Sequence, residues 1–223
     1  MYVLGISALY HDSAAAVIKD GEIIAAAQEE RFTRRKHDQS IPVNAIRYCM
    51  DETGITAKEL EAVVYYDNPA LTVERFVSNL KYAGADAKDL LNLFFLPLIE
   101  QKMWIHKYLE HAVGSLGFAG KLYVTQHHIS HAASAFYPSP YEKAVIITMD
   151  GVGEWATTSI GYGKGNEIKL LKEIDYPHSL GLLYSAFTYF CGFKVNSGDY
   201  KLMGLAPYGE PVYYQQIKDY LIK

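Results

Sequence analysis

The sequence predicts an α/β protein with a mixed sheet, and three observations support this class. The first 30 residues read as three strands, at 2–7, 14–19 and 22–28, and the last two are joined by an Asp-Gly step typical of hairpins. Segments of helical period then alternate with short apolar runs. Residues 144–150 (AVIITMD) form a continuous apolar run, which is typical of a central strand buried on both faces.

The other elements follow in chain order. Pro42 and Gly54 mark the start and end of a helix, because proline suits the first helical position and glycine the residue after the last. The two helices at 71–82 and 86–111 are expected to form a helical insertion over about 70–115. Further strands are expected at 60–67, 122–125, 157–162 and 168–174, and further helices at 127–136, 180–191 and 212–222.

The composition excludes some classes of function. The 223 residues are 50% hydrophobic and carry a formal net charge of −4, so no broad positive field attracts DNA or an anionic membrane. No apolar run reaches the roughly 18 residues of a membrane span, and the N-terminus lacks a signal-peptide pattern. We therefore expect a cytoplasmic protein. The final helical pattern runs to the last residue, so we expect a longer parent protein.

A histidine cluster occurs in the segment TQHHISHAASAF. His127 and His131 are four residues apart and lie on one face of the expected helix. Two imidazoles at this spacing can ligate one metal ion, although a chance cluster at a helix start explains the pair equally well. His128 lies about a quarter-turn away and is expected to support the site or contact its ligand.

Asp150 ends the apolar run and precedes Gly151 and Gly153. A carboxylate at the carboxyl end of a strand, before a glycine turn, stands where α/β proteins place ligand groups. The two glycines allow the backbone to approach a phosphate closely, and an ordinary turn is the plain alternative. Its position 19 residues after the histidine pair makes this signal more specific than an isolated Asp-Gly-x-Gly turn.

Three further segments hold candidate residues. His11 and Asp12 fall in the turn between the first two strands, where they can bind substrate or act as a general base, or form a polar hairpin tip. Lys36 lies in the basic segment EERFTRRKHDQSIP, which can neutralise an anion or be a solvated loop. Gly181 lies at the start of the helix at 180–191, where an N-terminus suits an anion.

Six ordered blocks together resemble the N-terminal half of the carbamoyltransferases of the nodulation-protein (NodU) and antibiotic-tailoring type. They cover most of the chain outside the helical insertion. The blocks are YHDSAAAVIKDG, EERFTRRKHDQSIP, QHHISHAASAFYPSP, MDGVGEW, PHSLGLLYSAFT and GDYKLMGLAPYGEP.

The resemblance implies a lobe of the actin-like ATPase (ribonuclease H-like) fold. A strand, turn and hairpin pattern that recurs at 5–24 and 147–168 agrees with the duplication in that fold. The implied reaction transfers a carbamoyl group from carbamoyl phosphate to a hydroxyl of a sugar or antibiotic. The reaction passes through a carbamoyl-adenylate that is made from ATP. It also uses a divalent metal ion, for which iron is the main expectation and zinc and manganese are alternatives.

The resemblance also implies roles for single residues. His127 and His131 would ligate the metal, and Asp150 would ligate it or contact phosphate. His11, beside Asp12, would act at the acceptor hydroxyl, and Lys36 would contact the carbamoyl-adenylate. The phosphate site would be shaped by Gly151, Gly153 and Gly181.

Residues 1–223 would then form the N-terminal lobe, with the second lobe and a YrdC-like domain outside this chain. The expected partners are a small hydroxylated acceptor and the remainder of the same protein, and homodimerisation is left open. Other hypotheses are a threonylcarbamoyl-type transferase acting on transfer RNA, a non-catalytic nucleotide- or partner-binding fragment, and a sugar kinase. The absence of a Glu between His127 and His131 counts against the threonylcarbamoyl-type transferase. The histidine pair itself counts against the sugar kinase, which predicts no such pair.

Overall fold

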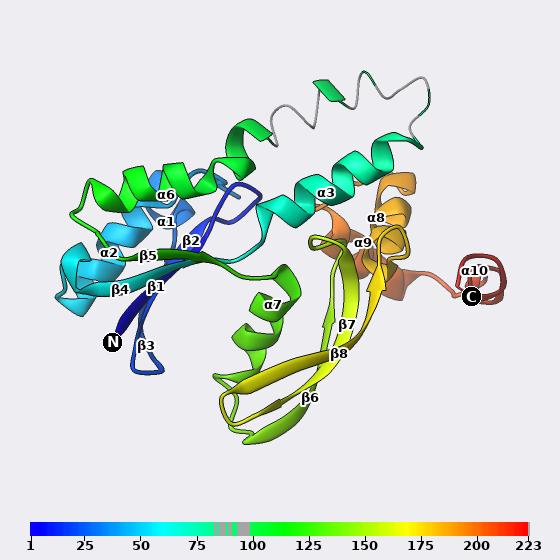
Figure 1. The fold of residues 1–223 in the computed structure, drawn as a ribbon. Helices are drawn as coiled ribbons and strands as arrows, with labels where there is room; N and C mark the ends of the chain where they lie inside the picture. Colours follow the sequence, from blue (N-terminus) through cyan, green and yellow to red (C-terminus); the bar gives the residue numbers. More distant parts are fainter. Residues whose placement is uncertain (83, 85–87, 89–90, 93–98, 223) are drawn as a thin grey trace.

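The protein forms two β-sheets that lie on either side of one helix, α7 (Figure 1). The computed structural model describes residues 1–82, 84, 88, 91–92 and 99–222. The strands are β1 (Tyr2–Ser7), β2 (Ala14–Lys19), β3 (Glu22–Gln28), β4 (Leu60–Tyr65), β5 (Lys121–Val124), β6 (Lys143–Met149), β7 (Ala156–Lys164) and β8 (Glu167–Asp175). The α-helices are α1 (Glu30–Thr33), α2 (Val43–Thr53), α3 (Pro69–Leu80), α6 (Ile105–Gly114), α7 (His127–Phe136), α8 (Leu180–Phe190), α9 (Asp199–Leu205) and α10 (Tyr214–Leu221). Two short 3₁₀ helices, η1 (Ala57–Glu59) and η5 (Ala206–Tyr208), and a π-helix, η4 (Ile99–Met103), complete the described helices.

The first sheet is mixed and has the strand order β3-β2-β1-β4-β5. Strands β1, β2 and β3 are antiparallel neighbours, whereas β4 is parallel to β1 and β5 to β4. The second sheet, β6-β7-β8, is again an antiparallel meander. A three-stranded antiparallel start therefore occurs in each sheet. This topology confirms the α/β class, the mixed sheet and the repeated pattern expected of an actin-like lobe.

One face of the first sheet carries the main core. Leu4, Val17 and Val63 are fully buried there, and α2 and α6 cover them with residues such as Ile46 and Leu109. Because side chains on a strand alternate between faces, the same strands present their other residues toward α7. Each fully buried aliphatic side chain stabilises the fold by about 1.5–3 kcal/mol.

Helix α7 packs its inner face on the second sheet. Ala132 and Phe136 are buried against Ile146 of β6. Gly163 of β7 makes room for this contact, since an added Cβ would lie 2.6 Å from the Phe136 ring. His128, Ala132 and Phe136 are four residues apart and share the buried face, so His127 and His131 lie beside that face and can reach the end of β6.

Some expectations need correction. The run 144–150 forms a strand, but β6 pairs only with β7 among the described strands and alternates in burial, with Val145 72% exposed. The expected central strand buried on both faces is therefore wrong for the described residues. The helix expected at 86–111 falls partly outside the described residues, and its described part comprises η4 and most of α6.

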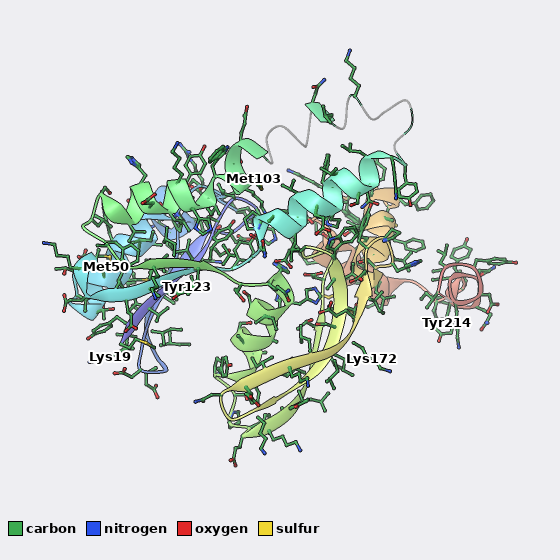
Figure 2. All side chains as sticks on the ribbon, viewed as in Figure 1. Lys19, Met50, Met103, Tyr123, Lys172 and Tyr214 are labelled. Carbon is green, nitrogen blue, oxygen red and sulfur yellow. The ribbon has the colours of Figure 1, made fainter. Side chains whose placement is uncertain are left out.

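Figure 2 shows Tyr214 on α10, which lies apart from both sheets and buries no residue.

Candidate metal and acceptor site

A cavity of about 1020 Å³ lies between the two sheets and gathers most of the candidate residues. It is bounded by the turn after β1, the start of α7, the end of β6 and the start of α8. Of the nine candidates from the sequence, the lining includes His11, Asp12, His127, His131, Asp150, Gly151 and Gly181. Residues from four distant parts of the chain thus face one space.

The three expected metal ligands converge within this cavity. The Nε2 atoms of His127 and His131 lie 3.0 Å apart. Oδ2 of Asp150 lies 2.9 Å from Nε2 of His127 and 3.5 Å from Nε2 of His131. One ligand atom from each residue lies within 4.8 Å of the others. The arrangement therefore presents two imidazole nitrogens and one carboxylate oxygen to a common point.

Local structure explains why Asp150 lies next to the two histidines. The turn after β6 is closed by hydrogen bonds from Asp150 N to Thr157 O and from Gly153 N to Ala156 O. The Ser179 hydroxyl donates to the carbonyl of Gly151 at 2.7 Å and accepts from an N–H of α8, so it joins this turn to the helix. This helix start can approach the turn only because residue 181 is glycine.

Two glycines bring the backbone close to the ligands. An added Cβ on Gly181 would lie 2.2 Å from the carbonyl oxygen of Asp150, and one on Gly153 would lie 3.1 Å from Cβ of His127. Gly153 does not line the cavity, although its backbone packs closely against the side chain of His127. Gly153 and Gly181, which were expected to shape a phosphate site, thus allow close packing around the candidate metal ligands.

His128 is almost completely buried and supports Asp150. Its Nε2 lies 3.2 Å from Oδ1 of Asp150, and its Nδ1 lies 2.8 Å from the Thr148 hydroxyl and 3.1 Å from that of Ser159. The expectation that His128 supports the site agrees with this placement. Burial acts to raise the pKa of Asp150, but the close approach of the three imidazoles outweighs it and lowers that pKa far below its ordinary value. The carboxylate is therefore ionised, as a metal ligand must be.

These residues fit a divalent metal ion. Both carboxylate oxygens of Asp150 and Nε2 of His128 are buried without a hydrogen bond of good geometry, although imidazoles lie close by. An imidazole nitrogen lies about 2.1 Å from a bound divalent ion, so two such nitrogens are about 3.0 Å apart at the right angle of an octahedral site and about 3.4 Å apart at a tetrahedral site. The 3.0 Å between the two Nε2 atoms matches the octahedral spacing.

The second group in the cavity is built on Asp12. Its Oδ2 lies 2.7 Å from Nδ1 of His11, and its Oδ1 lies 3.0 Å from Nδ1 of His37. Partial burial acts to raise the pKa of Asp12, and the contacts with His37 and His11 outweigh it and lower that pKa. His37 was not recognised from the sequence, because its contact joins two loops 25 residues apart. Asp12 therefore orients His11 at the cavity wall.

Lys36 stands apart from the other candidates. It is exposed and does not line the cavity. Its loop is nevertheless attached to the His11 turn, since Ser13 N donates to Asp38 O at 2.8 Å and Leu9 N to Gln39 O at 2.9 Å. The structure thus brings seven of the nine candidates to the cavity, places Gly153 behind His127, and leaves Lys36 on the adjoining loop.

Glu154 was also not recognised as a candidate. It is buried four residues after Asp150, and its carboxylate accepts hydrogen bonds from the backbone N–H groups of His127 and Asn68. The MDGVGEW block contains this residue, but its partners are backbone groups distant in sequence. A polar residue directly after the Asp-Gly-x-Gly turn is the only sign of it in the sequence.

Comparison with known proteins identifies the family. The family model described as the carbamoyltransferase N-terminus matches residues 2–223, so the chain belongs to this family. An uncharacterised protein of Synechocystis sp., sll1178, is 52% identical over 99% of this chain and 37% of its own length. The nodulation protein NolNO of Sinorhizobium fredii is 33% identical over 90% of this chain and 28% of its own length. The chain thus spans about a third of these relatives.

A solved structure also resembles the chain. The ROK hexokinase of Thermus thermophilus has a TM-score of 0.47 and 15% sequence identity, with 96% of this chain and 72% of that chain covered. Within the described part of the chain, no helix combines the length and apolar character needed to cross a membrane.

Proposed function

We propose that this chain is the N-terminal part of an ATP-dependent O-carbamoyltransferase. The enzyme transfers a carbamoyl group from carbamoyl phosphate, through a carbamoyl-adenylate, to a hydroxyl of a sugar or natural product. Family membership supports the reaction class. The observation that carries the proposal is that the His127, His131 and Asp150 cluster and the His11–Asp12 pair face the same cavity. An ion site and a proton acceptor are the two elements that this transfer needs.

In this proposal His127, His131 and Asp150 hold a divalent metal. Two imidazoles and a carboxylate are borderline donors that suit iron first in this family, with zinc or manganese as alternatives. When bound, the ion supplies Lewis acidity toward carbonyl and phosphate oxygens. Asp150 contributes a charge that burial has not neutralised, because the surrounding imidazoles lower its pKa.

His11 takes the proton of the acceptor hydroxyl. Its Nδ1 faces Oδ2 of Asp12 at 2.7 Å, which assigns the ring proton to Nδ1 and leaves the lone pair of Nε2 as the base. Asp12 holds the ring in that orientation and stabilises the positive charge as the proton arrives. As the hydroxyl oxygen bonds to the carbamoyl carbon, its proton moves to Nε2 of His11. The bond between that carbon and the phosphate oxygen of the adenylate breaks, and AMP leaves with the electron pair.

Lys36 and the glycines serve the anionic part of the donor. Lys36 lies beside His37, whose ring contacts Asp12, so its loop adjoins the acceptor side of the cavity. Gly151 and Gly181 line the cavity next to the start of α8, where backbone N–H groups favour an anion. Since the chain spans about a third of its relatives, we assign further metal and adenine contacts, and adenylate formation, to parts of the protein outside residues 1–223.

An assay with the full-length protein tests this function. The protein is incubated with ATP, carbamoyl phosphate, the metal and a panel of hydroxylated acceptors, and products are examined by mass spectrometry. We expect a carbamoylated acceptor with wild type and at least a 100-fold lower kcat with His11→Ala, since general-base catalysis is worth about 10²–10⁴-fold. The control is His111→Ala, an exposed histidine on α6. Unchanged turnover by His11→Ala would remove its assigned role, and no product with any acceptor would contradict the function.

A further inference from the structure

Glu154 occupies a junction between the two sheets. It lies in the loop between β6 and β7, is 5% exposed and does not line the cavity. Its Oε1 accepts from Asn68 N at 2.7 Å and from His127 N at 2.9 Å, and its Oε2 lies 3.1 Å from the same His127 N. One buried carboxylate therefore joins the starts of α3 and α7.

The first N–H groups of a helix have no partner within it, and they favour a negative charge. The residue before α7 is Gln126, whose side chain makes no capping hydrogen bond. Glu154 takes over that function from a distance of 27 residues in the sequence. The residue whose N–H it receives is His127, so the cap acts on the first proposed metal ligand.

Arg75 reinforces the same junction. Its Nε donates to the carbonyl oxygen of Glu154, and its guanidinium lies 5.4 Å from the ring centre of Tyr176. Arg75 belongs to α3, which follows β4 of the first sheet, whereas Glu154 lies in the loop before β7 and Tyr176 directly follows β8, both strands of the second sheet. Figure 1 shows α3 reaching from the first sheet toward the second. Both the backbone and the side chain of Glu154 are thus held by α3.

The carboxylate of Glu154 does not line the cavity, and its oxygens accept these backbone N–H groups instead. Glu154 lies four residues after Asp150 on one loop, and Gly153 between them packs on His127. Through this loop, Glu154 links the helix that carries the two histidines to the strand end that carries the carboxylate.

We propose that Glu154 is a positioning residue for the metal site, which sets the distance between the imidazole of His127 and the carboxylate of Asp150. This inference rests on the proposed metal site. Removal of the Glu154 side chain frees the start of α7 from the Asp150 loop. Supporting residues around a metal typically contribute 10–100-fold to its affinity, so we expect a loss of about that size.

Two substitutions in the full-length protein test this role. Glu154→Ala removes the acceptor, whereas Glu154→Gln keeps one oxygen that can accept from both Asn68 N and His127 N. Each protein is titrated with Co²⁺, and the visible absorption of the bound ion reports its ligand geometry. We expect Glu154→Ala to bind Co²⁺ about 10–100-fold more weakly with an altered spectrum. Glu154→Gln should restore most of the affinity and the wild-type spectrum.

Glu29→Ala is the matched control. Glu29 is also a buried carboxylate at a helix start, where it accepts from Ala45 N at 2.8 Å and from the Asn44 side chain at 2.6 Å. Its carboxylate caps the start of α2, a helix that covers the first sheet, and it does not line the cavity. This variant should lower the unfolding temperature but keep the wild-type Co²⁺ spectrum and affinity.

The outcomes separate the two proposals. If wild type binds no Co²⁺ or Fe²⁺, the metal site itself is wrong. If wild type binds the ion and folded Glu154→Ala binds it with the same affinity and spectrum, the metal site stands and the positioning role is wrong. If Glu154→Ala does not fold, Glu154→Asp, whose shorter side chain cannot reach both Asn68 N and His127 N, takes its place, and a folded Glu154→Asp with wild-type affinity and spectrum overturns the role equally.

Discussion

The Nε2 atoms of His127 and His131 lie 3.0 Å apart, one turn from each other along α7. Two neutral imidazoles gain at most one hydrogen bond from this approach, and the rings meet edge to face with centres 4.5 Å apart. Oδ2 of Asp150 closes the same small space. This relationship is the geometric basis of the proposed metal site, and several measurements can test what maintains it.

The first prediction concerns Gly181. Gly181→Ala places a Cβ about 2.2 Å from the backbone carbonyl oxygen of Asp150. This carbonyl group can move away only if the whole turn after β6 shifts. We expect a loss of about 1–3 kcal/mol in the free energy of unfolding, as for other overpacked sites, and weaker metal binding. Urea unfolding and metal titration measure both.

Gly151→Ala is the matched control for these two quantities. Its added Cβ would meet only Leu182 Cδ2, at 3.6 Å, which is an ordinary contact. We expect it to retain wild-type stability and metal affinity. Equal behaviour of the two variants would show that the close approach of α8 to Asp150 does not matter.

A second prediction concerns His128. His128→Leu keeps the volume near α7 but removes the group that faces Oδ1 of Asp150. The Thr148 and Ser159 hydroxyls remain hydrogen-bonded to each other. We therefore expect a folded protein whose metal affinity falls by about 10–100-fold. Isothermal titration against His111→Leu, an exposed site on α6, measures the difference, and matching affinities would refute this supporting role.

The loop that carries Lys36 and His37 gives a prediction on pH. The Ser40 hydroxyl and N–H and the Thr33 hydroxyl donate to Asp38, and these hydrogen bonds lower its pKa. The unfolded-state pKa of an Asp carboxyl is about 3.9. A carboxyl whose pKa is lower in the folded state stabilises the fold at pH values above about 3.9, and this stabilisation is lost as the pH falls through the folded-state pKa.

Asp38→Asn should therefore be about 1–2 kcal/mol less stable than wild type at pH 7, and the difference should shrink below about pH 4. Urea unfolding at a series of pH values from 7 to 3 measures it. A difference that stays constant over the whole range would show that ionisation of Asp38 does not hold this loop.

The proposed metal ligands could be selected from the sequence because each occurs in a local pattern. Helical periodicity alone places His127 and His131 on one face, and a strand end before glycines locates Asp150. Glu154 and His37 could not be found in this way. Their partners are a backbone N–H and a carboxylate that only the folded chain brings near.

Strand β6 shows a different limit. Its apolar run correctly predicts a strand, because β-branched residues favour that conformation. The pattern records how apolar the side chains are, but not which surfaces cover them. Among the described residues, β6 has one neighbouring strand, and Val145, Ile147 and Met149 are exposed. Helix α7 covers only the opposite face, on which Ile146 lies.

The metal content of the full-length protein tests most directly whether His127 and His131 bind a metal ion. Wild type, His127→Ala/His131→Ala and a control pair, His106→Ala/His111→Ala, are loaded with Fe²⁺ without oxygen, desalted and measured by elemental analysis. The control removes two exposed histidines of α6. We expect about one ion per chain in wild type and in the control, and a near-complete loss in His127→Ala/His131→Ala. An unchanged metal content in folded His127→Ala/His131→Ala would contradict the proposed metal site.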